Sequence, residues 1–331
     1  MMNLSFTRSF GLLTAVQSLF RGCGQVMFQG NGWTGLFFLV GIFWGACTAG
    51  TPAVAWGAVV GLLASTCTGY LLRQPCEEGE AGLWGFNGIL VGCAFPTFLG
   101  NTPAMWAALV LCACATTWVR TGFNNVMRPW KVNSLTFPFV FLTWMFLFAA
   151  RMLAAIPSSS LAVPVLTMHT AGTLDVGLTS LVTYWLKGIA QVFLIDSWFT
   201  GLLFLVALFI SSRWAALWAA VGSAVALLTA ILFQAPDTYI AAGLYGFSPV
   251  LTAIALGCTF YRPGVRTAVW TLLGVLTTVF VQAGMDALML PFGIATLTAP
   301  FCITTWLFLL PLYKLEHKEA DHSHWHKTVT K

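Results

Sequence analysis

Two threonines, Thr136 and Thr298, are the strongest candidates for polar chemistry in this chain. Each lies in the same short motif, Leu-Thr-x-Pro-Phe, at residues 135–139 and 297–301. A proline inside a helix leaves the carbonyl four residues earlier without its usual hydrogen-bond donor. If each helix extends that far back, the carbonyl two residues before each threonine is free as well. Both motifs then offer acceptors to a solute rich in N–H groups, unless the threonines bond within their own helices.

Two glutamines recur in the same way. Gln25 ends the stretch Arg-Gly-Cys-Gly-Gln, and Gln191 ends Lys-Gly-Ile-Ala-Gln. We expect both amides to border a cavity, although hydrogen bonding between helices is an equally common use of glutamine in membranes. The basic residue four positions earlier, Arg21 or Lys187, is expected to snorkel at the end of a span rather than to contact a solute.

A third repeated pair predicts flat apolar walls. Phe86 and Leu90 are four residues apart, as are Phe247 and Leu251, so each pair lies on one helical face. A slot with aromatic walls and an edge of acceptors suits a small, planar, neutral molecule. It does not suit a cation, which needs charge or converging carbonyls around it.

These walls belong to two short apolar segments, residues 82–99 and 243–257, which open with Gly-Leu-Trp-Gly-Phe and Gly-Leu-Tyr-Gly-Phe. A spanning helix needs about 20 apolar residues, so neither segment crosses a bilayer comfortably. Short, glycine-interrupted segments at matching positions of two halves point to a solute site. We therefore predict two half-membrane pore helices, whose glycines line the pore rather than simply pack against other helices.

The overall composition is that of a polytopic membrane protein. Of 331 residues, 58% are hydrophobic and 8% are charged, whereas a soluble domain carries about 25% charged residues. The net charge of +5 is dispersed along the loops, so no nucleic-acid partner is expected. Most of the nine cysteines lie within apolar runs, where a free thiol behaves as a small hydrophobe. Neither a disulfide framework nor a metal site is expected.

No catalytic motif is visible. The sequence has no HExxH, GxSxG or CxxC pattern, and His169 is the only histidine before the C-terminal tail. We therefore expect neither an enzyme nor a bound cofactor. Ion-coupled transporters place ionisable groups at mid-membrane, whereas Asp196 and Asp286 fall near the ends of predicted spans. Their placement favours passive permeation.

The motifs belong to an internal duplication, because matched residues keep an offset between 161 and 166. The predicted fold is all-α, with ten transmembrane helices plus the two half-membrane helices. Residues 1–156 form the first half, 157–172 a linker, 173–313 the second half and 314–331 a polar, His-rich tail. Five spans in each half is an odd number, so the two copies insert in opposite senses as inverted repeats.

The basic residues favour one orientation. With the N-terminus inside, most of them fall on the cytoplasmic side, including a predicted basic loop that carries Arg120, Arg128 and Lys131. Both termini are therefore expected in the cytoplasm, and the protein in the cytoplasmic (inner) membrane.

The paired glycine–aromatic, Gln-Val and Thr-x-Pro-Phe motifs resemble the urea transporter family over roughly residues 20–312. The resemblance implies a selective urea channel, a homotrimer in membrane lipid with one pore in each protomer. It also implies a role for each repeated residue. The slot walls are Phe86, Leu90, Phe247 and Leu251; Gln25 and Gln191 border the outer and inner urea sites; Thr136 and Thr298 line the central constriction.

Two features depart from the family pattern. The second half has Ser-Pro at 248–249 where the first has Asn-Gly at 87–88, which predicts a different bend of that half-helix. The turn after the first helix reads Gly-Asn-Gly at 30–32, where the family has Asn-Asn-Pro.

Other hypotheses stay open at this stage. A channel for ammonia, a short amide or water is the nearest, although ammonia conduction favours pore histidines and none is predicted in a span. An intramembrane enzyme needs a nucleophile–base pair at depth, and a ligand sensor needs a sizeable soluble domain; neither is apparent. The sequence does not give the selectivity among urea analogues, the regulation or the role of the tail.

Overall fold

The computed structural model describes residues 12–159, 161 and 174–311. These residues form helices and one isolated antiparallel bridge between Leu99 and Ser158. The predicted linker 157–172, with His169, lies outside the described residues except for 157–159 and 161. The predicted tail 314–331 lies outside them entirely.

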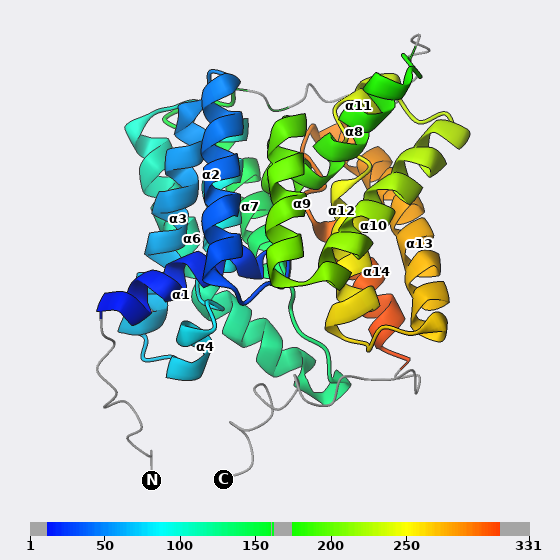
Figure 1. Cartoon of the computed structure of the whole chain (residues 1–331). Helices are drawn as coiled ribbons and strands as arrows, with labels where there is room; N and C mark the ends of the chain where they lie inside the picture. Colours follow the sequence, from blue (N-terminus) through cyan, green and yellow to red (C-terminus); the bar gives the residue numbers. More distant parts are fainter. Residues whose placement is uncertain (1–11, 160, 162–173, 312–331) are drawn as a thin grey trace.

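The helices of the two halves follow each other in the same order (Figure 1). The first half has α1 (Leu12–Gln25), α2 (Gly32–Thr48), α3 (Pro52–Leu71), α4 (Cys76–Glu80), α5 (Phe86–Phe98), α6 (Pro103–Met127) and α7 (Phe137–Ala150). The second has α8 (Leu178–Ala190), α9 (Trp198–Ser211), α10 (Arg213–Leu232), α11 (Asp237–Ala241), α12 (Phe247–Ile254), α13 (Val265–Met289) and α14 (Ala299–Leu309).

The duplication extends to unusual backbone angles. Left-handed residues occupy matching positions, Gly82 (φ 83°) with Gly243 (φ 73°) and Leu135 (φ 52°) with Leu297 (φ 52°). Glycine adopts this conformation at little cost, whereas leucine does not. Both halves therefore hold a strained turn directly before Thr136 and Thr298, and the surrounding structure must enforce it.

Helices α2 and α9 lie side by side and run antiparallel (Figure 1). The Thr34 hydroxyl donates to the Ala207 carbonyl at 2.9 Å, and the Thr200 hydroxyl donates to the Gly41 carbonyl at 2.8 Å. Thr34 matches Thr200 in the repeat, and Gly41 matches Ala207. The two hydrogen bonds are therefore one contact made twice, as a two-fold rotation between the halves requires.

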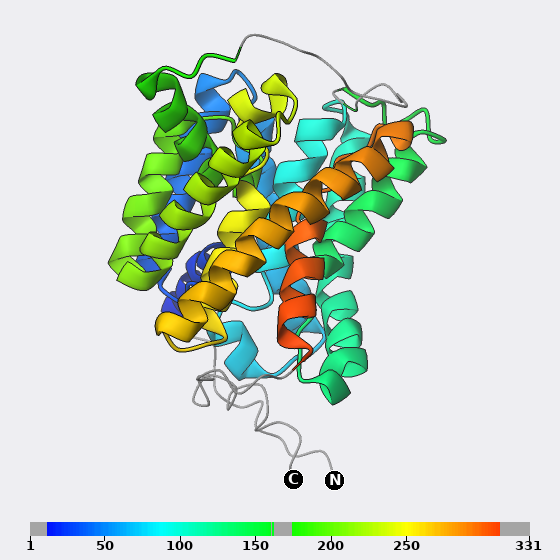
Figure 2. The same cartoon turned by 90° about the vertical axis from the view of Figure 1, so that its right-hand side faces the viewer.

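Within the part of the chain that the structure describes, four segments are long and apolar enough to cross a membrane. They are α3, α10, Pro103–Trp130 and Val265–Phe292. Five shorter apolar helices accompany them, together with the pair Leu178–Phe193 and Trp198–Ser211, which is bent by 73°. Figure 2 shows the long helix α13 running obliquely beside α14. The all-helical fold with several apolar helices is confirmed within the described residues, and the count of ten spans stays a prediction.

The two half-helices begin later than predicted. Helix α5 starts at Phe86, and α12 starts at Phe247 and continues as a π-helical turn, Ala255–Thr259. The residues from Gly82 to Gly85 form a turn instead. A Cβ on Gly82 would lie 2.4 Å from the backbone nitrogen of Gly22, so this turn packs directly against α1. A helix of 13 residues is about 20 Å long, well short of a bilayer core.

The glycines of this region pack helices rather than line a pore, so that prediction is wrong. A Cβ on Gly88 would lie 2.0 Å from the Ser65 hydroxyl, and one on Gly92 would lie 2.0 Å from the Gly57 carbonyl oxygen. Helices α3 and α5 therefore approach almost backbone to backbone. Small residues permit such close packing in membranes, where dispersion replaces the hydrophobic effect between helices.

The prolines of the Thr-x-Pro-Phe motifs begin helices and do not interrupt them. Helix α7 starts at Phe137 and α14 at Ala299, with the proline in the first turn. The helices do not extend back to Ser134 and Thr296, whose carbonyls accept hydrogen bonds from the backbone N–H groups of Phe137 (3.0 Å) and Ala299 (3.2 Å). The predicted freed carbonyls are therefore wrong, because the first turn of a helix has no internal acceptors for its N–H groups, so a proline there displaces no hydrogen bond.

The close packing of α3 and α5 predicts a steep stability cost at Gly61. A methyl group there would lie 2.1 Å from the carbonyl oxygen of Gly88. We expect Gly61→Ala to lower the thermal midpoint of the purified protein in detergent, since overpacking costs about 1–3 kcal/mol. The control Gly122→Ala has nothing within 4 Å of the new methyl group and should leave the midpoint unchanged or raise it. Equal midpoints for the two variants would contradict this packing.

Candidate functional site

The hydroxyls of Thr136 and Thr298 meet in the interior of the molecule, where they join its two halves and form what we call the central pair. Their oxygens are 2.7 Å apart, and each residue is 3% exposed. Each threonine directly precedes its helix, and its side chain makes no hydrogen bond to that helix. The hydroxyls are therefore free to bond each other, and the Cys302 thiol lies 3.3 Å from the Thr136 oxygen.

Two tryptophans fix the loops that carry these threonines. The Trp144 indole donates to the Ala295 carbonyl at 3.0 Å, and the Trp306 indole donates to the Asn133 carbonyl at 2.8 Å. Trp144 matches Trp306 in the repeat, and Asn133 matches Ala295. The helix of each half thereby holds the loop of the other half. Sequence analysis missed this role, although the repeated Thr-Trp pairs at 143–144 and 305–306 signal it.

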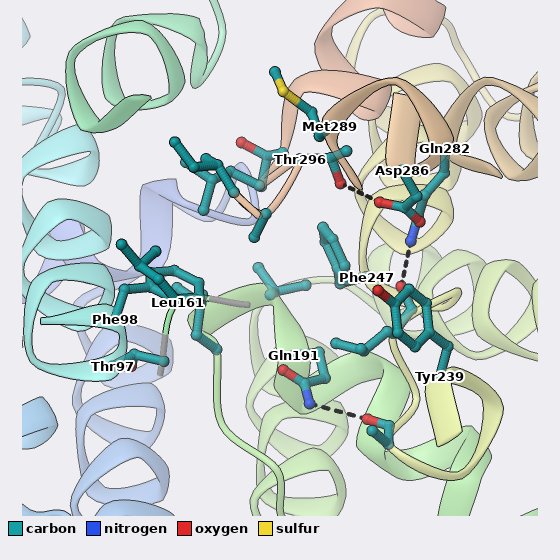
Figure 3. Close-up of a pocket in the computed structure, with 18 of the residues that line it drawn as sticks. Thr97, Phe98, Leu161, Gln191, Tyr239, Phe247, Gln282, Asp286, Met289 and Thr296 are labelled. Carbon is teal, nitrogen blue, oxygen red and sulfur yellow. Dashed lines mark hydrogen bonds between the residues drawn. The ribbon is translucent and has the colours of Figure 1, made fainter. Parts of the chain in front are cut away.

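One cavity opens on each side of the hydroxyl pair. The first-half cavity, about 680 Å³, is lined among others by Gln25, Phe86 and Thr136. The second-half cavity, about 390 Å³, is lined among others by the three matching residues, Gln191, Phe247 and Thr298 (Figure 3). The structure thus brings six of the predicted site residues to two matching cavities with a threonine of each half between them.

The two glutamines combine both predicted uses. Each lines its cavity, and each side-chain amide donates to a backbone carbonyl of the neighbouring turn. Gln25 donates to Ala81 and Gln191 donates to Ala242, both at 2.9 Å. These hydrogen bonds hold the side chain in one orientation. Figure 3 shows the oxygen of Gln191 turned away from the Ala242 carbonyl.

The apolar walls are only partly as predicted. Phe86 and Phe247 are each 8% exposed and line their cavities. Leu90 and Leu251 are completely buried and line neither cavity. They lie one turn further along α5 and α12, so their contact with a solute stays a prediction. The arrangement offers a solute aromatic surface, amide groups and a pair of uncharged hydroxyls.

The first-half cavity contains a buried ion pair that was not predicted, and the position predicted for one of its members, Arg120, is wrong. Arg120 was predicted in a basic loop, but α6 continues to Met127 and Arg120 lies within it, 2% exposed. Its guanidinium pairs with Glu78 of α4 and reaches the Gln74 amide oxygen at 3.4 Å. In the second half, Gln282 and Tyr239 occupy the matching positions. The isolated basic residue after an apolar run gave no sign of its partner 42 positions earlier.

The carboxylates of the second-half cavity differ in their partners. Asp196 pairs with Lys187 at 2.8 Å. Asp286 accepts a hydrogen bond from the Thr296 hydroxyl at 2.8 Å (Figure 3). Both lie near helix ends, where they were predicted. Within the described residues, no three His, Cys, Asp or Glu side chains are grouped so that they could hold a metal ion.

Comparison with known proteins gives one consistent result. A family model described as urea transporter matches residues 16–313. Urea transporter 1 of Ovis aries is 31% identical over 301 residues, which cover 90% of this chain and 77% of the relative. Urea transporter 1 of Mus musculus is 29% identical over 319 residues, which cover 92% of this chain and 81% of that relative. The family match includes both halves and both cavities.

The buried ion pair predicts a large effect when one partner is removed. Glu78→Tyr copies the second-half residue and leaves the Arg120 guanidinium unpaired, which costs about 3–5 kcal/mol when the pair is fully buried. Because Glu78 is 25% exposed, we expect the lower end of that range, measured as a fall in the thermal midpoint in detergent. The double variant Arg120→Gln/Glu78→Tyr copies the second half at both positions and should recover most of the loss. A double variant no more stable than the single one would contradict the pairing.

Proposed function

The chain belongs to the urea transporter family, and on this premise we propose that it is a passive, selective urea channel of the cytoplasmic membrane. The observation that carries the proposal is the Thr136–Thr298 hydroxyl pair between two matching cavities. Urea is a planar molecule with four N–H donors and one carbonyl. Aromatic faces on Phe86 and Phe247 suit its plane, and hydroxyl oxygens suit its N–H groups.

Urea passes the centre in single file. The 2.7 Å contact between the two hydroxyls leaves no room for a molecule between them. A threonine hydroxyl reorients by a simple rotamer change, and the net value of the hydrogen bond that is broken is only about 1 kcal/mol. Each hydroxyl oxygen then accepts a hydrogen bond from an N–H group of urea, which replaces the bond between the two hydroxyls. Gln25 and Gln191 border the waiting positions on the two sides, and Leu90 and Leu251 complete the slot walls as urea moves inward.

Transport is uncoupled to ions. Ion-coupled transporters need an ionisable group near the middle of the membrane. The charged residues of this path line the two cavities and not the central pair. Arg120 is paired with Glu78 and Asp196 with Lys187, and Asp286 accepts a hydrogen bond from Thr296. The central pair consists of neutral hydroxyls. Urea therefore moves down its own gradient, and no ion is carried with it.

The two halves sit in the membrane as inverted repeats of five spans and one half-helix each, with both termini in the cytoplasm. Support comes from the antiparallel crossing of α2 and α9, whose two hydrogen bonds exchange matching residues. The apolar segments alternate with turns in the same order in both halves. This arrangement places the Thr136–Thr298 pair on the pseudo-two-fold axis, near the bilayer midplane.

The functional unit is a homotrimer with one pore per protomer. Large apolar side chains such as Trp56, Leu111 and Phe209 are more than half exposed on the single chain. Such side chains contact lipid or a neighbouring protomer in a membrane protein. The family resemblance selects the trimer among these possibilities.

The proposal predicts fast urea flux that ignores ion gradients. Protein in liposomes should speed urea equilibration, followed by stopped-flow light scattering, well above protein-free liposomes. Imposed proton or sodium gradients should leave the rate unchanged. Flux that needs a gradient would contradict the passive mechanism. Folded protein that passes a short amide or water but not urea would show that the substrate is another small neutral solute.

A further inference from the structure

We propose that the second-half cavity binds a planar cation of the guanidinium type at Asp286, and that this cation blocks urea from that side. The block rests on the proposed urea channel, whereas the binding does not. The inference starts from the charges around this cavity, which differ from those of the first-half cavity although the backbone is repeated.

Asp286 has no cationic partner among the described residues. None of the residues that line the second-half cavity is Lys, Arg or His. The nearby Lys187 pairs with Asp196. Arg151 reaches the edge of the cavity, but its guanidinium donates to the carbonyls of Phe292 at 2.6 Å and Gly293 at 3.3 Å. Asp286 is therefore a partly buried carboxylate without a positive partner, and a bound cation would stabilise its charge.

A second acceptor points to the same ligand. Gln282 lies one turn before Asp286 on α13 and is 1% exposed. Its nitrogen donates to the Leu244 carbonyl, which fixes the amide, while its oxygen accepts no hydrogen bond. A buried polar atom without a partner destabilises the protein. A ligand with several N–H donors satisfies this oxygen and the carboxylate together.

Aromatic rings supply the third element. Figure 3 shows Phe247 and Tyr239 on the same side of the cavity as Asp286 and Gln282. Guanidinium is planar, weakly hydrated and stacks on aromatic faces, and its paired N–H groups match a carboxylate in two parallel hydrogen bonds. A sodium or potassium ion lacks these donors. The carboxylate, the amide oxygen and the aromatic rings together therefore favour a planar cation over a spherical one.

The first-half cavity supports this assignment by contrast. At the positions of Asp286, Gln282 and Tyr239 it holds Asn124, Arg120 and Glu78. There the protein provides its own guanidinium, already paired with a carboxylate. An added cation finds no free negative partner at those positions and is repelled by Arg120. The first-half cavity is also lined by Glu77 and Glu80, but it lacks the combination of Asp286 with the unpaired Gln282 oxygen. We therefore expect binding of this kind in the second-half cavity.

The bound cation does not pass through. At the Thr136–Thr298 pair it would have to exchange its water for two hydroxyl oxygens, and two neutral oxygens do not replace the hydration of a charge. A cation held at Asp286 lies against Phe247, on the path of urea through this cavity. It therefore acts as a blocker of one entrance.

Binding is tested first, without transport. Guanidinium chloride at low millimolar concentration is titrated into the purified full-length protein by calorimetry, with choline chloride as the ionic-strength control. We expect saturable binding that Asp286→Asn, which copies Asn124, weakens about tenfold or more, as expected when a charge-assisted pair becomes neutral. Gln282→Arg, which copies Arg120, should weaken it as well. The matched control Asp237→Asn changes a carboxylate that does not line the cavity and should bind as the wild type does.

The block is tested with urea flux in vesicles of known protein orientation. Guanidinium on the side of the second-half cavity should slow urea entry, guanidinium on the other side should not, and Asp286→Asn should be insensitive on both sides. Equal binding by wild type and folded Asp286→Asn protein overturns the site. Equal block from both sides, or passage of guanidinium itself, overturns the one-sided blocker. Absence of urea flux with intact Asp286-dependent binding refutes the proposed function and leaves the site standing.

Discussion

The rest of the structure depends on the hydrogen bond between Thr136 and Thr298. This bond joins the two halves directly before the helices α7 and α14 begin. Each threonine follows a leucine with a left-handed backbone conformation. The helix that begins after the threonine has a proline in its first turn. The hydroxyls make no bond to their own helices and can reach each other. The two indole hydrogen bonds exchanged between the halves hold both loops in register. A shift of either half along the other would break these contacts together.

Duplication explains why the backbone is symmetric while the two cavities differ chemically. The close helix contacts, such as those of Gly82 with Gly22 and Gly243 with Gly188, tolerate no side chain and are therefore alike in both halves. The cavity walls carry no such restriction. One half has a buried ion pair, and the other has an amide and a carboxylate without a cation. In our account, this freedom lets a symmetric path have two different entrances, one of which recognises planar cations.

Much of this arrangement could be predicted from the sequence, because the chain contains two copies of one unit and the residues that both copies share can be identified. Identical side chains at a nearly constant offset identified Gln25, Phe86 and Thr136 with their partners, and the structure places all six at the two cavities. The errors have physical causes. A proline does not reveal whether it begins or interrupts a helix, and a glycine does not reveal whether it faces a pore or another backbone. Arg120 looked like a loop residue because its partner Glu78 lies on another helix. The depth of Leu90 depends on how α5 packs, which periodicity alone does not give.

The most direct test of the central claim is urea flux through the double variant Thr136→Val/Thr298→Val in liposomes. Removing both hydroxyls together avoids an unpaired partner in the resting protein, so folding should be retained, as a thermal melt would verify. A urea N–H group then passes the constriction without an acceptor, at a cost of about 1–3 kcal/mol. Since 1.4 kcal/mol corresponds to a factor of ten in rate, flux should fall by about 5- to 140-fold. Unchanged flux through the folded double variant would show that urea does not cross at this pair.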